Sequence, residues 1–283
     1  MRKNIVYWVV LAALAFPSCK KDNEGSGLKA VFSYVADGYK VNFTNFSTNA
    51  TEYRWDFGDN SGVASTSKTP QHIFTQKGDF LVTLVAKNGT DSSVFKDSVS
   101  IIGPNIRIDG DFADWQYVSF SHENAPGYAS TLLGVKTFAS ADMLNFYIEG
   151  TADMKLELFD MYIDADNDPA TGFATWMYPA GSGANFLAEG SPYGGWGDLY
   201  AHNGPPSAFS WNPVATFADA MKFSAVMNKG TKKAVEFSIK KSALGTMKNF
   251  VNFAFIELNS SWAETGKLPE SAQPSSKFIA IQL

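Results

Sequence analysis

Three aspartates at alternate positions are the residues of this chain best suited to hold a metal ion. The stretch YIDADNDPATGF, residues 162–173, places Asp164, Asp166 and Asp168 directly after an apolar run. Calcium takes six to eight oxygen ligands, and a loop that leaves a strand with acids at alternate positions offers carboxylates and backbone carbonyls together. Asn167 adds a further oxygen donor. The glycine and distal glutamate of an EF-hand are absent, so a calcium site here needs another geometry.

Two other interpretations of the same stretch stay open. Asp, Asn and Pro are typical turn residues, and Pro169 and Gly172 would fix the ends of such a turn. Catalysis needs partners, but His72, His122 and His202 lie far apart, and the sequence contains neither a nucleophile elbow nor a phosphate-binding glycine loop. A glycosidase needs only two well-spaced carboxylates, so that class stays open on the residues alone. Our expectation is a protein that is not an enzyme.

Aromatic residues of the later part of the chain suit sugar binding better. Several fall in glycine- and proline-rich segments such as EGSPYGGWGDLY, residues 189–200, which we predict to be loops. A flat aromatic face packs on the C–H groups of a sugar ring, while Glu189, Asp198 and Asn203 would accept its hydroxyls. Since a single tryptophan is more often a core residue, the alternative is that most of these rings are buried. The expected carbohydrate-binding residues are Trp176, Tyr178, Tyr193, Trp196, Tyr200 and Trp211, with Trp176 and Trp196 favoured and Trp262 in the same aromatic set.

The first residues predict export. Arg2 and Lys3 precede the apolar run IVYWVVLAALAF, residues 5–16, and Cys19 follows shortly after. This pattern is typical of a signal peptide, here residues 1–18, and the run is too short to span a bilayer core of about 30 Å. Removal of residues 1–18 changes the formal net charge from −5 to −7, because it removes two positive charges. An acidic mature chain argues against a nucleic-acid partner.

Cys19 is the only cysteine, so no intramolecular disulfide can form. Its position resembles the lipobox of bacterial lipoproteins, although Phe16 stands where leucine is most usual, and the resemblance implies lipidation at Cys19. Residues 19–27 read as a flexible tether. Asp22 and Glu24 within it resemble the export signal of Bacteroidetes surface lipoproteins, which implies an outer-membrane protein held by its lipid alone and exposed at the cell surface. Simple secretion with a free thiol is the alternative.

Two predicted hairpins indicate the first folded unit. Strand-like runs flank Asp37-Gly38 within residues 30–47 and Asn88-Gly89 within residues 79–101. Between them lies WDFGD, residues 55–59, which resembles the signature of PKD (polycystic kidney disease) domains. The resemblance covers residues 28–102 and implies a small Ig-like β-sandwich that acts as a spacer or contact module. The aromatic residues of the motif are expected in the core, and its aspartates at turn amides.

A second domain is predicted over residues 105–283, after a break at Gly103-Pro104-Asn105. Many short strands without long helices favour an antiparallel sandwich, so the chain is predicted to be all-β. One short helical turn is expected at residues 240–246. The predicted strands are residues 131–138, 143–150, 156–163, 222–226, 234–239, 250–258 and 277–283.

The opening of this domain, IRIDGDFADWQ at residues 106–116, resembles the start of family 9 carbohydrate-binding modules and of the related DOMON-like sandwiches. AVEFSIKKSALG, residues 234–245, resembles a later segment of the same modules. The resemblance implies a larger β-sandwich of carbohydrate-binding-module type, often with structural calcium and with no organic cofactor. It gives Asp109, Asp114 and Trp115 structural roles.

The expected function is therefore a non-catalytic cell-surface lipoprotein that binds a polysaccharide or oligosaccharide through its last domain. Its expected role is polysaccharide capture or uptake, beside other outer-membrane uptake proteins. One alternative is a surface lipoprotein for protein interaction or structure, without sugar binding. Another is haem binding, as in other DOMON-like proteins, with Met143 or Met177 as an axial ligand.

Overall fold

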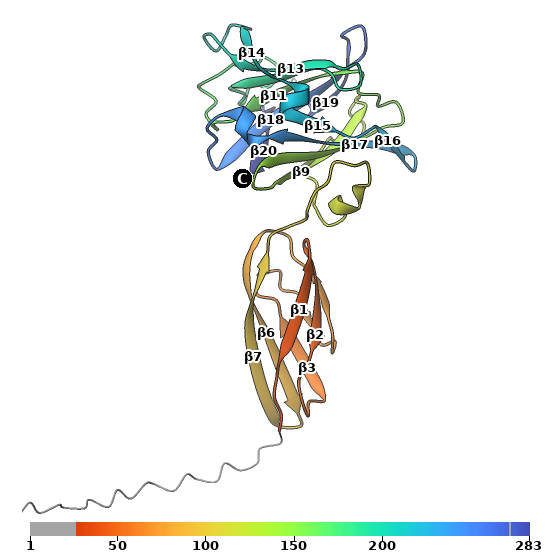
Figure 1. Ribbon diagram of the computed structural model, residues 1–283, viewed down its shortest axis with the longest axis vertical. Helices are drawn as coiled ribbons and strands as arrows, with labels where there is room; N and C mark the ends of the chain where they lie inside the picture. Colours follow the sequence, from red (N-terminus) through yellow and green to blue (C-terminus); the bar gives the residue numbers. More distant parts are fainter. Residues whose placement is uncertain (1–26, 272) are drawn as a thin grey trace, which may run out of the picture. The chain divides into compact units, whose positions relative to one another are not determined.

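The first domain is a two-sheet β-sandwich. The computed structural model describes residues 27–271 and 273–283, so the predicted signal peptide, lipidation site and most of the tether lie outside the described residues. One sheet has the order β1-β2-β5 and the other β4-β3-β6-β7 (Figure 1). Their bounds are β1 Phe32–Asp37, β2 Lys40–Asn45, β3 Glu52–Asp56, β4 Ala64–Ser65, β5 Gln71–Ile73, β6 Gly78–Asn88 and β7 Asp91–Ile101. The predicted turns at Asp37-Gly38 and Asn88-Gly89 are confirmed.

The WDFGD motif is part of this domain's core, as predicted. Trp55 is completely buried and donates a hydrogen bond from Nε1 to the carbonyl oxygen of Ser67 at 2.9 Å. Oδ1 of Asp56 accepts from the backbone N–H of Gly58. A Cβ on Gly58 would lie 2.5 Å from the carbonyl oxygen of Leu81, so only glycine fits this close approach. The motif is thus a packing and turn device.

The second domain packs two antiparallel sheets face to face (Figure 1). The six-stranded sheet has the order β15-β17-β10-β9-β8, with β16 paired to β17, and comprises β8 His122–Glu123, β9 Leu132–Ala139, β10 Met143–Gly150, β15 Met221–Phe223, β16 Met227–Lys229 and β17 Lys232–Lys240. The seven-stranded sheet has the order β14-β13-β12-β11-β18-β19, with β20 paired to β18, and comprises β11 Leu158–Asp164, β12 Phe186–Ser191, β13 Trp196–His202, β14 Trp211–Thr216, β18 Phe250–Leu258, β19 Glu264–Leu268 and β20 Ile279–Gln282.

The main core lies between these sheets. Alternate residues of each strand enter it, among them Phe146 of β10, Phe159 of β11 and Phe237 of β17. Phe146 and Phe237 stack with their ring planes 10° apart, and Phe159 packs on Phe255 in the same way. The opposite side of β11, β12 and β13 carries Asp160, Tyr162, Glu189, Asp198 and Tyr200, and we call it the outer face.

One buried carboxylate of the six-stranded sheet holds residues 106–116 in place. Glu236 of β17 is fully buried and accepts three hydrogen bonds. Its Oε1 accepts from the backbone N–H groups of Asp109 and Gly110 at 2.8 and 2.7 Å, and its Oε2 accepts from Nε1 of Trp115 at 2.8 Å. Asp114 pairs with Arg107. The structural roles predicted for Asp109, Asp114 and Trp115 match these contacts.

Six strands of the second domain were not predicted, namely β8, β12, β13, β14, β16 and β19. The segment 189–200, expected to be a loop, is instead the hairpin of β12 and β13, so that expectation was wrong. Glycines in this hairpin interrupt the alternation of apolar and polar side chains that predicts a strand. β14 contains Pro213, which an edge strand tolerates because one side of its backbone needs no ladder bond. The predicted helical turn is the 3₁₀ helix η2, Lys241–Leu244. No helix among the described residues is long and apolar enough to cross a membrane.

Candidate functional site

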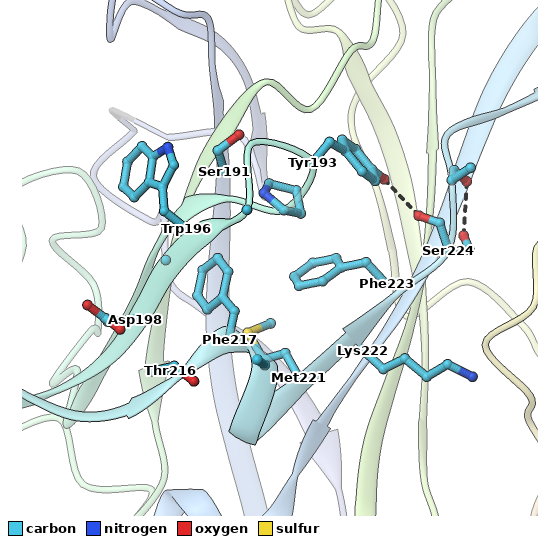
Figure 2. A pocket seen from close by; sticks show the side chains of 15 residues that line it. Ser191, Tyr193, Trp196, Asp198, Thr216, Phe217, Met221, Lys222, Phe223 and Ser224 are labelled. Atoms are coloured by element: carbon cyan, nitrogen blue, oxygen red, sulfur yellow. Dashed lines mark hydrogen bonds between the residues drawn. The ribbon is translucent and has the colours of Figure 1, made fainter.

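A groove of about 650 Å³ lies at the open edge between the two sheets of the second domain. The β12–β13 hairpin forms one wall, and the short helix α1, Phe217–Ala220, with β15 forms the other. Figure 2 shows the rings of Tyr193, Phe217 and Phe223 lining it, and Trp196 and Asp198 of β13 border it as well. The volume falls in the range of small-molecule sites, roughly 300–1,000 Å³.

Side-chain and backbone hydrogen bonds fix the hairpin turn. Ser191 Oγ donates to the carbonyl oxygen of Glu157 at 2.7 Å and accepts from the backbone N–H of Gly194 at 3.0 Å. The hydroxyl of Tyr193 donates to the carbonyl oxygen of Ser224 at 2.8 Å, which joins the hairpin to the opposite wall. Burial raises the pKa of Tyr193 to about 12, so its hydroxyl stays a donor at neutral pH. Half of the Tyr193 side chain remains exposed.

Paired glycines bring β12 and β13 close to an aromatic floor. Gly190 and Gly197 stand opposite each other in the ladder. A Cβ on Gly197, whose φ is +148°, would lie 2.2 Å from the ring of Phe217. Phe217 in turn stacks on Phe159 of the main core, with 5.3 Å between ring centroids. Because the glycines admit Phe217, the floor of the groove is continuous with the core.

Trp196 and Trp262 form an exposed aromatic pair, which we call the Trp pair. Their ring centroids are 6.1 Å apart with planes at 46°, and their exposed fractions are 47% and 50%. Trp262 lies in the β18–β19 turn with φ +64°, a conformation that costs a bulky residue about 1–3 kcal/mol. Oδ1 of Asn259 accepts from the N–H groups of Ser261 and Ala263 and stabilises this turn. Two segments far apart in the chain thus present one apolar surface.

Carboxyl groups lie in a row beside the Trp pair on the outer face. Asp160 stands opposite Glu189 in the β11–β12 ladder, and Glu189 stands opposite Asp198 in the β12–β13 ladder. Burial, and then the negative charge of Glu189, raise the pKa of Asp160 to about 7. Burial also raises the pKa of Glu189. The row therefore offers hydrogen-bond acceptors, with part of its charge suppressed near neutral pH.

The structure separates the predicted sugar-binding residues into four groups. Tyr193 and Trp196 line the groove, and Trp176 is 74% exposed on a turn outside it. Tyr200 and Trp211 are partly buried against the cluster that covers the outer face. Tyr178 is only 1% exposed, and its hydroxyl donates to the carbonyl oxygen of Pro269 at 2.9 Å.

The prediction for Tyr178 was therefore wrong, because residues 173–184 fold back over the outer face and carry this ring inward. The neighbouring Met177, considered as a haem ligand, is buried in the same cluster. Sequence reasoning left Phe217 and Phe223 out of the site, and it noted Trp262 in the aromatic set without listing it as a binding residue. The pairing of Trp262 with Trp196, which lies 66 positions earlier, is visible only in the folded chain.

Asp164, Asp166 and Asp168 serve as turn acceptors. Oδ1 of Asp164 and Oδ1 of Asp166 both accept from the backbone N–H of Asp168, at 3.3 and 3.1 Å. Asp168 caps the N–H of Ala170, and Asn252 donates to Asp164. Among the residues that the structure describes, no group of three or more His, Cys, Asp or Glu side chains is arranged to hold a metal ion. These contacts support the turn interpretation, and calcium binding stays a prediction.

Comparisons with known proteins identify the first domain. Residues 27–94 match the PKD domain family, which confirms the predicted PKD domain. Among solved structures, the chain is similar to the PKD1 domain of the Vibrio cholerae metalloprotease PrtV, with 28% identity over 26% of this chain and 96% of that one and a TM-score of 0.24. It is also similar to the PKD1 domain of Vibrio anguillarum Epp, with 25% identity over 26% of this chain and 93% of that one and a TM-score of 0.25.

A third similarity extends over more of the chain. It is to a structure described as a basis for the promiscuous specificity of carbohydrate-binding modules from the β-sandwich superfamily, with 14% identity over 87% of this chain and 100% of that one and a TM-score of 0.24. A search of curated proteins gave no match. Similarities with such low TM-scores do not identify a ligand for this chain.

Proposed function

We propose that the second domain is a non-catalytic saccharide-binding module whose contact surface is the Trp pair and the groove beside it. The observation that carries this proposal is the exposure of two tryptophan rings, Trp196 and Trp262, held together by two fixed turns. The half of each ring that stays exposed to water contributes no burial energy to folding. A rigid apolar face bordered by acceptors suits a sugar, which has apolar C–H faces and a hydroxyl rim.

Polar groups suited to sugar hydroxyls surround this face. Asp198 lies on the same side of β13 as Trp196 and lines the groove with Thr216. Carboxylates accept hydroxyl hydrogens through several lone pairs, and the threonine hydroxyl both donates and accepts. The proposed ligand is therefore a neutral polysaccharide or oligosaccharide, stacked on the Trp pair and hydrogen-bonded toward the groove.

The carboxyl geometry supports binding without cleavage. Glycosidases hold two carboxyl groups roughly 5–9.5 Å apart on either side of the scissile bond. Asp160 and Glu189 instead stand directly opposite each other in the ladder, and Oδ1 of Asp160 is sealed from solvent. We infer that a glycosidic bond does not reach between them and that this pair does not catalyse hydrolysis.

A protein-interaction role is the second candidate, and a separate observation favours it. Trp176 and Phe209 are 74% and 60% exposed, and the two loops that carry them are joined by a hydrogen bond from Ala174 to Pro206. Exposed aromatic residues are typical anchors of protein interfaces. If this surface is the functional one, the Trp176→Ala change impairs the protein and the Trp196→Ala change does not.

We further propose that the chain is a lipoprotein of the outer membrane, anchored at Cys19 and exposed at the cell surface, and that it serves polysaccharide capture. The apolar run after Arg2 and Lys3 and the single cysteine behind it support this proposal. Metabolic labelling with a fatty acid tests it: the wild-type chain should carry the label in the membrane fraction, and Cys19→Ala should not. Label on the Cys19→Ala chain would refute anchoring at this residue.

The experiment that tests saccharide binding is affinity electrophoresis of the purified chain in gels containing plant, host and microbial polysaccharides. We expect at least one neutral glycan to retard the protein. Trp196→Ala should weaken this binding by about 30-fold, because truncation of a central tryptophan costs about 2 kcal/mol or more. Phe46→Ala removes an exposed aromatic ring of the first domain and serves as the matched control.

Repeating the gels with a calcium chelator tests the calcium prediction in the same experiment. Loss of retardation would assign a calcium ion to the loop of Asp164, Asp166 and Asp168. Unchanged retardation would leave these residues as turn acceptors. If no glycan retards the wild-type chain, or if Trp196→Ala binds as tightly as the wild type, the proposed site is wrong.

A further inference from the structure

Asp160 and Glu189 are neighbouring carboxyl residues on the outer face. They stand opposite each other in the β11–β12 ladder, and neither belongs to the metal-candidate loop. Oδ1 of Asp160 is sealed from solvent and has no hydrogen-bond partner. Two ionised carboxylates at directly opposite positions of a partly buried ladder repel each other, and a proton held between them removes the repulsion and supplies the missing donor.

Among the residues that the structure describes, no nearby cation substitutes for this proton. The neighbours of the pair on β13 are Asp198 and Tyr200, and its neighbour on β11 is Tyr162. On β18, Ile256 stands opposite Asp160. On β19, Glu264 adds negative charge to the environment of Asp160, and the nearby Lys267 is already ion-paired with Glu264. Every ionisable group that faces the pair is thus acidic, phenolic or already neutralised.

The same burial that isolates the pair favours its protonated form. Burial raises the pKa of Asp160 to about 7, whereas a free aspartate titrates near 3.9. Near neutral pH, the protonated and ionised forms of Asp160 are therefore both populated.

We propose that Asp160 and Glu189 share one proton and that this proton makes saccharide binding to the adjoining Trp pair and outer face pH-dependent. This inference rests on the proposed function for its binding half only. With the proton present, the pair is a singly charged unit with an internal O–H···O bond. When the proton leaves to solvent, two adjacent like charges remain in the row that borders Trp196.

A bound sugar would strengthen the preference for the protonated pair. A saccharide stacked on Trp196 and extending along the ladder toward Asp198 and Glu189 removes water from the carboxyl row. Removal of water disfavours the doubly ionised form more than the singly ionised one, so binding raises the pH at which the proton leaves. By linkage, loss of the proton weakens binding by the same factor.

Thermal unfolding of the purified chain tests the shared proton without any ligand. A carboxyl whose folded pKa is raised destabilises the fold increasingly as pH rises from about 4 to about 7, and the loss is complete above that range. Asp160→Asn keeps the shape and donates permanently to Glu189. We expect its Tm to exceed that of the wild type by several degrees at pH 8 and to approach it at pH 4.

Asp153→Asn, an exposed carboxylate of the same domain, is the control and should change Tm little at either pH. Glu189→Gln is a second variant in case Asp160→Asn fails to fold, and it should also gain in relative stability toward pH 8. A constant Tm difference between wild type and both variants from pH 4 to pH 8 would overturn the shared proton.

Binding measurements test the proposed link between the shared proton and saccharide binding. With the glycan that retards the protein in gels, we expect the wild-type dissociation constant to be about tenfold larger at pH 9 than at pH 6, as for one linked proton whose pKa binding shifts by about one unit. Asp160→Asn should bind equally at both pH values. Equal pH dependence in wild type and variant would overturn the link to binding. If no glycan binds at either pH, the proposed function fails while the Tm comparison still decides the shared proton.

Discussion

Glu236→Ala is expected to destabilise the second domain by about 3 kcal/mol or more, because three donors lose their only acceptor in a buried place. The backbone N–H groups of Asp109 and Gly110 and the indole N–H of Trp115 all end on this carboxylate. For a domain of this size, the midpoint of thermal unfolding should fall by about 6–12 °C. Calorimetry of the full chain follows the second domain's transition separately from that of the PKD domain.

Milder variants resolve how the three bonds contribute. Glu236→Gln keeps an oxygen for the two backbone donors but turns an amide N–H toward Trp115, so we expect a loss of about 1–2 kcal/mol. Trp115→Phe removes the opposing donor, and the double variant should be no less stable than the sum of the single changes predicts. Glu123→Ala, on the exposed edge strand β8, is the control. A Glu236→Ala protein as stable as wild type would contradict the anchoring role of Glu236.

Gly197→Ala is expected to cost about 2–5 kcal/mol and to weaken saccharide binding together with stability. The new Cβ would lie 2.2 Å from the ring of Phe217, which cannot retreat because it stacks on Phe159 in the core. Overpacking of this kind costs about 1–3 kcal/mol, and the positive φ of Gly197 adds strain. Since Trp196 immediately precedes Gly197 in the chain, a displacement of the strand also moves the Trp pair.

Gly195→Ala provides the matched comparison two residues away. Its φ is +74°, but nothing lies within 4 Å of the place that a Cβ would take. We expect a loss of about 1 kcal/mol from backbone conformation alone. Chemical denaturation of both variants separates the clash from the strain. Equal losses for Gly195→Ala and Gly197→Ala would show that the contact with Phe217 does not constrain the hairpin.

Local chemistry made much of the fold predictable. The turns at Asp37-Gly38 and Asn88-Gly89 were visible because positive φ values need these residue types. The predicted strands at residues 143–150 and 250–258 coincide with β10 and β18. Apolar runs of this length favour buried strands. Both faces of β10 are buried because Phe112 and Trp115 cover Tyr147 on its far side.

The site was less predictable because its parts meet only in three dimensions. β12 and β13 carry glycines where a strand pattern needs apolar side chains, and those glycines are explained only by Phe217 behind them. The aromatic composition drew attention to Trp196, which is half exposed. It did not distinguish Trp196 from Tyr178, whose burial depends on a loop folding over the outer face.

The most direct test of the central claim is a double-mutant cycle on the Trp pair, measured by titration calorimetry with the retarding glycan. If Trp196 and Trp262 contact the same sugar, each single alanine variant should lose binding by about tenfold or more. The double variant should then lose clearly less than the product of the two factors, with a coupling of about 0.5 kcal/mol or more. Wild-type titrations without saturable heat, or two single variants that bind like wild type, would contradict saccharide binding at the Trp pair.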